Sequence, residues 1–231
     1  MDEMLRNIFR QFLEKIEVYY KTQIAYGFSI NKCSMSPFDQ HYDENNFDNK
    51  KGYNEVINNF YREMNYYHDS LIIKHHKRKY ANKMPLWVIV ELMSFSNISK
   101  LYNSMYFSEK DIIAKSVGIG AKTLENHLHC LSVMRNKCAH AARLYNTEFN
   151  PPAKFTTSFL KKHPEIKNNS LFAYILVLLK RLPDKDSKRT LIKMVKDVMD
   201  KYKTDIDMSL IGFPNNYLDT MNNILIQHDN T

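Results

Sequence analysis

Apolar residues along this chain recur at spacings of three and four, which is the period of amphipathic helices and not of strands. The first stripe runs from Leu5 to Tyr20 and predicts a helix over residues 3–26 that stops near Gly27. The polar stretch that follows, over residues 30–54, is rich in turn-forming residues and predicts a loop. The chain therefore opens with one long helix and a surface connection.

The same period continues to the end of the sequence. Further helices are predicted at about residues 56–71, 85–95, 108–118, 122–146, 171–182, 187–202 and 214–226. The stretch at 85–95 is apolar nearly all round and is expected in the core, while Pro151 and Pro152 end the longest pattern, at 122–146. With only 5 glycines and 7 prolines in 231 residues, the class is all-α, and we expect a single domain over residues 1–231.

Charge is spread unevenly along this basic chain. Residues 154–203 hold 13 Lys and Arg against 5 Asp and Glu, so the positive excess lies in this C-terminal helical part. A second basic cluster, KHHKRKYANK, begins at Lys74 and includes Lys77, Arg78 and Lys79. Clustered cations attract polyanions by neutralising phosphates, which makes RNA a candidate partner. Solvated helix faces would also account for such runs.

Other sequence features narrow the class of protein. No apolar run is long enough to cross a bilayer, and the start MDEMLRNIFRQF does not resemble a secretory signal, so we expect a cytoplasmic protein with no membrane partner. The three cysteines form no C-x-x-C pair, which suggests reduced thiols. Between residues 112 and 146 the only carboxylate is Glu125, too few acids for a magnesium or manganese centre, so we expect no metal or other cofactor.

The stretch VMRNKCAHAARLYN, residues 133–146, carries the candidate chemistry. On a continuous helix Asn136, His140 and Arg143 would share one face, with Arg135 about 140° away from His140 around the axis. Histidine can accept or donate a proton near neutral pH, and arginine can hold a phosphate and stabilise transition-state charge. These are the groups that cleave RNA without a metal. Alternatively, the arginines could be surface ion-pair partners and His140 an interior histidine.

One helix cannot easily bring Arg135 and His140 onto a single phosphodiester. Two copies related by a two-fold axis could, because each would bring its stripe to a shared cleft. We therefore expect a homodimer with a composite site.

Four segments, in order, resemble the Abi-like abortive-infection family (AbiD and AbiF type) of the HEPN superfamily of helical ribonucleases. They are residues 14–26, 85–105, 113–140 with the R-N-x-x-x-H pattern, and 211–218 (IGFPNNYL). The resemblance implies a HEPN-like helical bundle, here with additional C-terminal helices, and homodimerisation through the helix at about 122–146. Members usually carry a further N-terminal segment; we expect the catalytic part to be whole without it.

The activity that this resemblance implies is metal-independent RNA cleavage that leaves a 2′,3′-cyclic phosphate, in a toxin that defends against phage. Arg135, Asn136 and His140 take the catalytic places of the motif. We expect Arg143, Lys137 and the cluster Lys74, Lys77, Arg78 and Lys79 to bind RNA. A structured small RNA restrains some members of the family and is a further possible partner.

Two alternatives stay open. Some relatives in the superfamily keep the fold as RNA-binding scaffolds without cleavage. The stretch DIIAKSVGIGAKTLENHL, residues 111–128, fits a helix-turn-helix and would suit a DNA-binding regulator. Its second helix is longer than usual, however, and carries Glu125, His127 and His129 where phosphate or base contacts would lie, so DNA is the less expected partner.

Overall fold

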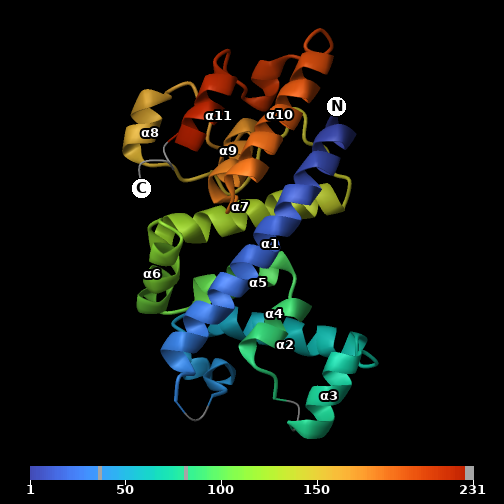
Figure 1. Cartoon of the computed structure of the whole chain (residues 1–231), viewed down its shortest axis with the longest axis vertical. Coiled ribbons are helices and arrows are strands. Elements are labelled where there is room, and N and C mark those ends of the chain that lie inside the picture. The colour runs from blue at the N-terminus through green and yellow to red at the C-terminus, as the bar shows by residue number, and fades with distance from the viewer. Residues whose placement is uncertain (36–37, 81–82, 227–231) are drawn as a thin grey trace. The chain divides into compact units, whose positions relative to one another are not determined.

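The computed structural model describes residues 1–35, 38–80 and 83–226, and it confirms the all-α class (Figure 1). These residues form α-helices joined by turns and short 3₁₀ segments, with no strand among them. None of the helices in this described part combines the length and the hydropathy that crossing a bilayer requires.

The helices belong to two compact units. Unit 1 comprises Met1–Glu17 and Asn126–Thr231, and unit 2 comprises Val18–Glu125. Two helices contribute residues to both: α1 (Asp2–Lys32) and α7 (Ala121–Ala139). The single domain expected from the sequence stays a prediction.

The first helix continues beyond the stop predicted at Gly27 and ends at Lys32. Glycine normally weakens a helix interior, but here it permits close packing in unit 2. A β-carbon at Gly27 would lie 2.4 Å from Cγ1 of Ile113, a side chain that is itself buried. The glycine is therefore a packing residue, and it does not end the helix.

Unit 2 is built from five further helices. These are α2 (Lys50–Tyr66), α3 (Leu71–Lys79), α4 (Leu86–Leu92), α5 (Phe95–Ser104) and α6 (Phe107–Ser116). The single helix predicted over 85–95 is wrong, because the backbone breaks at Met93 and Ser94 caps a new helix. The Ser94 hydroxyl accepts a hydrogen bond from the Asn97 amide at 3.3 Å. Most apolar residues of both halves are still buried, as the pattern predicted, but Trp87 is 62% exposed.

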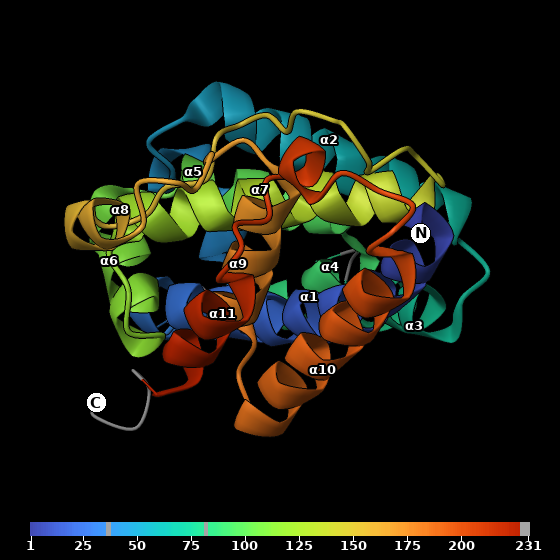
Figure 2. The same cartoon turned by 90° about the horizontal axis from the view of Figure 1, so that it is seen from above.

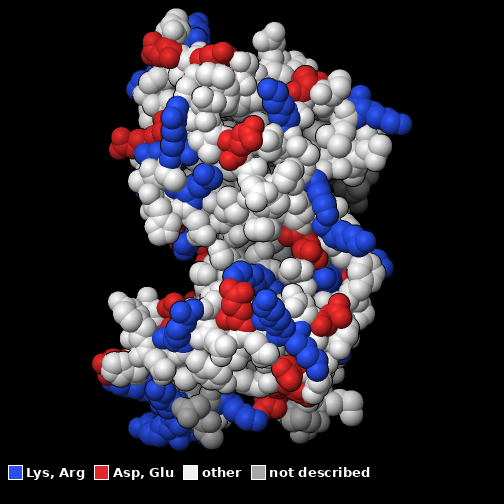
Figure 3. Space-filling model, turned by 180° about the vertical axis from the view of Figure 1, so that it is seen from behind, with Lys and Arg blue, Asp and Glu red and all other residues white. Residues whose placement is uncertain are grey.

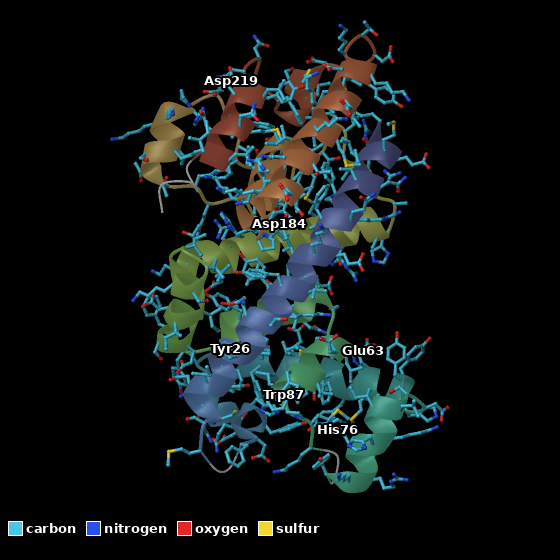
Figure 4. All side chains as sticks on the ribbon, in the orientation of Figure 1. Tyr26, Glu63, His76, Trp87, Asp184 and Asp219 are labelled. Carbon is cyan, nitrogen blue, oxygen red and sulfur yellow. The ribbon has the colours of Figure 1, made fainter. Side chains whose placement is uncertain are left out.

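Unit 1 surrounds an apolar helix, α9 (Leu171–Arg181), whose first nine residues are all buried. The other helices confined to this unit are α8 (Thr157–Lys162), α10 (Lys185–Tyr202) and α11 (Tyr217–Ile226). Helix α11 packs against both α9 and α10 (Figures 1 and 2). The carboxylate of Asp184, labelled in Figure 4, accepts a hydrogen bond from the Ser187 amide at 2.7 Å and so caps the start of α10.

Candidate functional site

Helix α7 ends at Ala139, seven residues before the end predicted from the sequence, so the prediction of a helix to residue 146 is wrong. The His140 amide still donates to the carbonyl of Asn136 at 3.0 Å, but Ala141 then adopts a positive φ of 53°. The Ala142 amide donates back to the carbonyl of Lys137 at 2.9 Å. This is a Schellman motif, in which the chain reverses through a left-handed residue.

The reversal changes which candidate residues share a face. His140 is the last residue to complete a helical hydrogen bond, so it remains one turn after Asn136. Arg143 lies beyond the reversal in non-helical chain, and the predicted stripe of Asn136, His140 and Arg143 is wrong at its third member. His140 is exposed, which excludes the interior histidine considered above, and within the described residues its ring has no hydrogen-bond partner.

Two arginines of α1 bind carbonyl oxygens at the end of α7 and in the reversal that follows it. Arg10 donates to the carbonyl of Cys138 from Nε at 3.0 Å and from Nη2 at 2.5 Å. Arg6 donates from Nη1 to the carbonyl of Ala142 at 3.0 Å. Cationic side chains at a helix C-terminus satisfy free carbonyls and oppose the negative end of the helix dipole.

Asp2, one turn before Arg6, holds the segment that follows the reversal. Its carboxylate accepts hydrogen bonds from the amides of Leu144 at 2.8 Å and Tyr145 at 3.1 Å. Leu144 is fully buried, which anchors the segment from the other side. Asp2, Arg6 and Arg10 thus form a clamp on residues 138–145, and we call these three residues the α1 clamp.

Arg135, a candidate catalytic residue, forms an ion pair with Glu17. Its Nε lies 3.4 Å from Oε2 of Glu17, on the same helix as the clamp, and its side chain is 38% exposed. The ion pair occupies the Nε edge of the guanidinium. The Nη groups make no hydrogen bond or ion pair among the described residues, so they remain available as donors to a phosphate.

Two other residues of the motif, Lys137 and Cys138, are held by contacts with the rest of the protein. Lys137 is half-buried, with its ammonium 5.3 Å from the ring centre of Phe149, a cation–π contact. Cys138 is fully buried, and burial raises the pKa of its thiol to about 11 against the opposing effect of Arg10 and Arg6. A thiol with so high a pKa is a packing residue and not a nucleophile.

The other predicted RNA-binding residues lie in unit 2, on the exposed faces of α3. We call Lys74, Lys77, Arg78 and Lys79 the α3 basic surface, and Figure 3 shows Lys and Arg side chains gathered over this helix at the lower left. Lys74 pairs with Asp69 at 2.8 Å, and Lys79 lies 5.8 Å from the ring centre of Tyr80. These residues are near one another, but they belong to a different unit from Arg135 and His140.

The helix-turn-helix connection between α6 and α7 exists, with Gly118 at the turn at a φ of 68°. The start of α7, however, binds within the protein. His127, expected to face outward, is buried and its Nε2 lies 2.7 Å from the carbonyl of Lys154. Asn126 bonds to the carbonyl of Pro152 and the amide of Lys154, and Glu125 pairs with Lys110 at 3.1 Å. Because these side chains already bind other residues of the protein, the start of α7 is poorly suited to contact DNA bases.

Sequence reasoning missed the residues that position the candidate site: the α1 clamp and Glu17. The signal was present, because Asp2, Arg6 and Arg10 are four residues apart and therefore lie on one helical face. What the sequence did not reveal was the partner, which lies about 130 residues later in the chain. Within the described ranges, no three His, Cys, Asp or Glu side chains are grouped so that they could hold a metal ion.

Comparison with known proteins gives one finding of similarity. Residues 1–146, more than half of the chain, match the family described as Abi-like protein. The matched part includes α1, α7 and His140 and ends just beyond the α7 reversal, whereas α8 to α11 lie outside it. No curated protein and no solved structure matches the chain.

Proposed function

The chain belongs to the Abi-like protein family, whose name refers to abortive infection as a defence against phage, and from this premise we propose that it is a metal-independent endoribonuclease. Its catalytic residues would be Arg135, Asn136 and His140, contributed by two copies of the chain. The observation that carries the proposal is the end of α7, where His140 is exposed at a position fixed by the α1 clamp.

His140 suits the proton-transfer role. An imidazole can accept the proton of the ribose 2′-hydroxyl while the 2′-oxygen attacks phosphorus, and water can protonate the 5′-oxygen as its bond to phosphorus breaks. The products are then a 2′,3′-cyclic phosphate and a free 5′-hydroxyl. Since the ring of His140 is exposed and has no partner among the described residues, it is free to approach RNA.

Arg135 suits the charge-stabilising role. Its Nη groups can donate to the phosphate oxygens, on which negative charge grows in the transition state. Glu17 holds the Nε edge and so restricts the guanidinium to one side of α7. Asn136, one turn before His140, can orient the histidine or the phosphate.

Two copies supply what one helix cannot. Arg135 and His140 are five positions apart and therefore point about 140° away from each other around the helix axis. In a two-fold dimer, Arg135 of one copy can face His140 of the other. The α1 clamp would contribute by holding the helix end rigid, because catalytic groups must be fixed to within about 0.5 Å of their productive positions.

RNA would be bound by cations outside the catalytic group. Arg143 is exposed directly after the reversal and forms no ion pair among the described residues. The α3 basic surface carries four cations, with the exposed Tyr66 and Tyr67 at the end of the preceding helix. Basic residues beside exposed aromatic rings suit unpaired RNA, whose bases stack on such rings. A structured regulatory RNA would use the same chemistry.

The proposal is tested by incubating the purified full chain with single-stranded RNA in EDTA and identifying the product ends. We expect cleavage with 2′,3′-cyclic phosphate ends, and loss of cleavage and of cellular toxicity in His140→Ala and Arg135→Ala. His129→Ala, an exposed histidine on the same helix, is the matched control and should cleave normally.

Other outcomes identify the alternatives. RNA binding by the wild type without cleavage would indicate a scaffold, and specific binding of duplex DNA would indicate a regulator. Equal cleavage by wild type and His140→Ala would overturn the catalytic assignment.

A further inference from the structure

Unit 1 contains a cavity of about 190 Å³ that lies outside the part of the chain matched to the family. Three helices line it: α8, α9 and α11. The lining residues are Thr156, Ser158, Phe159, Lys162, His163, Lys180, Thr220, Asn223 and Ile224. Among these residues are two lysines, one histidine and four hydroxyl or amide side chains, but no carboxylate.

Lys180 is a partly buried lysine in the lining of this cavity. It lies near the end of the buried helix α9, and its ammonium is 4.7 Å from the ring centre of Phe159. Burial, together with the nearby charges of Arg181 and Lys188, lowers its pKa to about 8. No ion pair to Lys180 occurs among the described residues. Lysines that line one cavity, with no carboxylate in its lining, favour the binding of an anion.

His163 supplies a further polar side chain to the lining. It is only 7% exposed, lines the cavity, and its ring lies 4.8 Å from that of Phe159. Its Nδ1 is buried 3.5 Å from Oε1 of Glu165, without hydrogen-bond geometry.

We propose that this cavity binds a terminal phosphate, that is, a phosphate monoester group. A phosphate monoester carries a charge of about −1.5 to −2 and several acceptor oxygens, which matches a lining with two lysines, several donors and no carboxylate, Glu165 lying outside the lining. Lysine is a common partner of phosphate as a point charge. The cavity is smaller than the roughly 300 Å³ at which pockets for drug-sized ligands begin, so it accommodates a phosphate with at most a sugar-sized body. The proposal does not depend on ribonuclease activity.

Two sources share this chemistry: a small phosphorylated metabolite and the 5′-phosphate end of an RNA. Inorganic phosphate and ribose 5-phosphate are the small probes, and a matched pair of short oligoribonucleotides with 5′-phosphate or 5′-hydroxyl ends tests the RNA source. Binding is measured on the full chain by calorimetry and by the rise in unfolding temperature.

We expect the small probes to bind wild type and to raise its unfolding temperature. Lys180→Met and the exposed Lys162→Met should each weaken binding at least tenfold, whereas Lys193→Met, an exposed lysine of α10, should not. A preference for the 5′-phosphate oligonucleotide that Lys162→Met abolishes would assign the site to RNA ends. Equal binding of both oligonucleotides would assign it to metabolites.

Two results would overturn the proposal. One is the absence of phosphate binding to wild type, and the other is equal affinity in wild type, Lys162→Met and Lys193→Met. Because Lys162 is on the surface, its variant is expected to fold, and the test therefore does not rest on Lys180→Met alone.

Discussion

Arg10 and Cys138, 128 residues apart in the chain, are joined by two hydrogen bonds from one guanidinium to one carbonyl oxygen, at 3.0 and 2.5 Å. This contact ties the first helix to the end of the helix that carries the catalytic candidates. It satisfies a carbonyl that would otherwise lack a partner, and it fixes the point, directly after His140, at which the chain reverses.

Removing this contact should affect both stability and activity. We expect Arg10→Met to lower the free energy of unfolding by ~1.5–3 kcal/mol, since hydrogen bonds to a charged group are lost from a partly buried carbonyl. RNA cleavage should fall more than the stability loss explains, because His140 loses its fixed position. Chemical denaturation and cleavage rates below the unfolding transition measure the two effects separately.

Arg189→Met is the matched control for this prediction. Arg189 is an exposed arginine of α10 whose one ion pair among the described residues is with Asp186, three residues away, and such pairs contribute at most ~0.5 kcal/mol. An equal loss of stability in both variants would show that the α1 clamp has no special role.

The reversal itself predicts a stabilising substitution. Ala141 has a positive φ of 53°, which costs a residue with a β-carbon ~1 kcal/mol and costs glycine almost nothing. Ala141→Gly should therefore raise the free energy of unfolding by ~0.5–1 kcal/mol. Ala142→Gly, at a position without positive φ, should leave it unchanged or lower it. Urea denaturation of the two variants compares them directly, and an equal effect would contradict the Schellman geometry.

A substitution at Gly27, inside α1, is expected to have the opposite effect on stability. Gly27→Ala gives a residue of better helix propensity, but its β-carbon would lie 2.4 Å from Ile113. Overpacking of this kind costs ~1–3 kcal/mol, so we expect net destabilisation in thermal unfolding. Gly120→Ala, with no atom within 4 Å of the added carbon, is the control and should be neutral. The penalty should shrink in an Ile113→Ala background, where a double-mutant cycle measures the coupling.

Burial of His127 predicts a pH-dependent stability. Burial lowers the pKa of His127 to about 3, with Arg181 and Lys180 adding to the effect, against 6.5 for the ordinary residue. Below pH 6.5 the unfolded chain gains a proton that the folded chain does not bind until about pH 3, so stability is lost as the pH falls through this window. The contribution is on the order of a few kcal/mol.

His127→Gln keeps a donor for the Lys154 carbonyl and removes this titration, so its stability should depend less on pH between 6.5 and 3 than that of wild type. His129→Gln, at an exposed position, should retain the wild-type dependence. Parallel pH profiles for wild type and His127→Gln would contradict the burial of a neutral histidine.

The sequence predicted the helices better than their ends. Periodicity identified the all-α class and the buried faces of α1 and α9, because both depend on spacing alone. The end of α7 could not be predicted, since Ala141 is neither glycine nor asparagine and the carbonyls there are bound by side chains from the distant α1 clamp. The helix end predicted at Gly27 was wrong because this glycine serves the close contact with Ile113, which local helix propensity does not reveal.

For the candidate site, the motif pointed to Arg135, Asn136 and His140 and chemistry suggested their roles, which stay predictions. Arg143 was misplaced because its position depended on an unbroken helix. Glu17 was overlooked because an ion pair across more than a hundred residues leaves no local pattern.

The most direct test of the proposed composite site is a subunit-mixing assay. Arg135→Ala and His140→Ala are each expected to be inactive, so the two purified proteins are unfolded together, refolded as a mixture and assayed on single-stranded RNA. If the two copies share a site, a mixed dimer retains one intact pairing of Arg135 with His140, and activity should return to about a quarter of the wild-type level for random two-fold pairing. A mixture that stays as inactive as its components, although mixed dimers form, would contradict a site built from two copies.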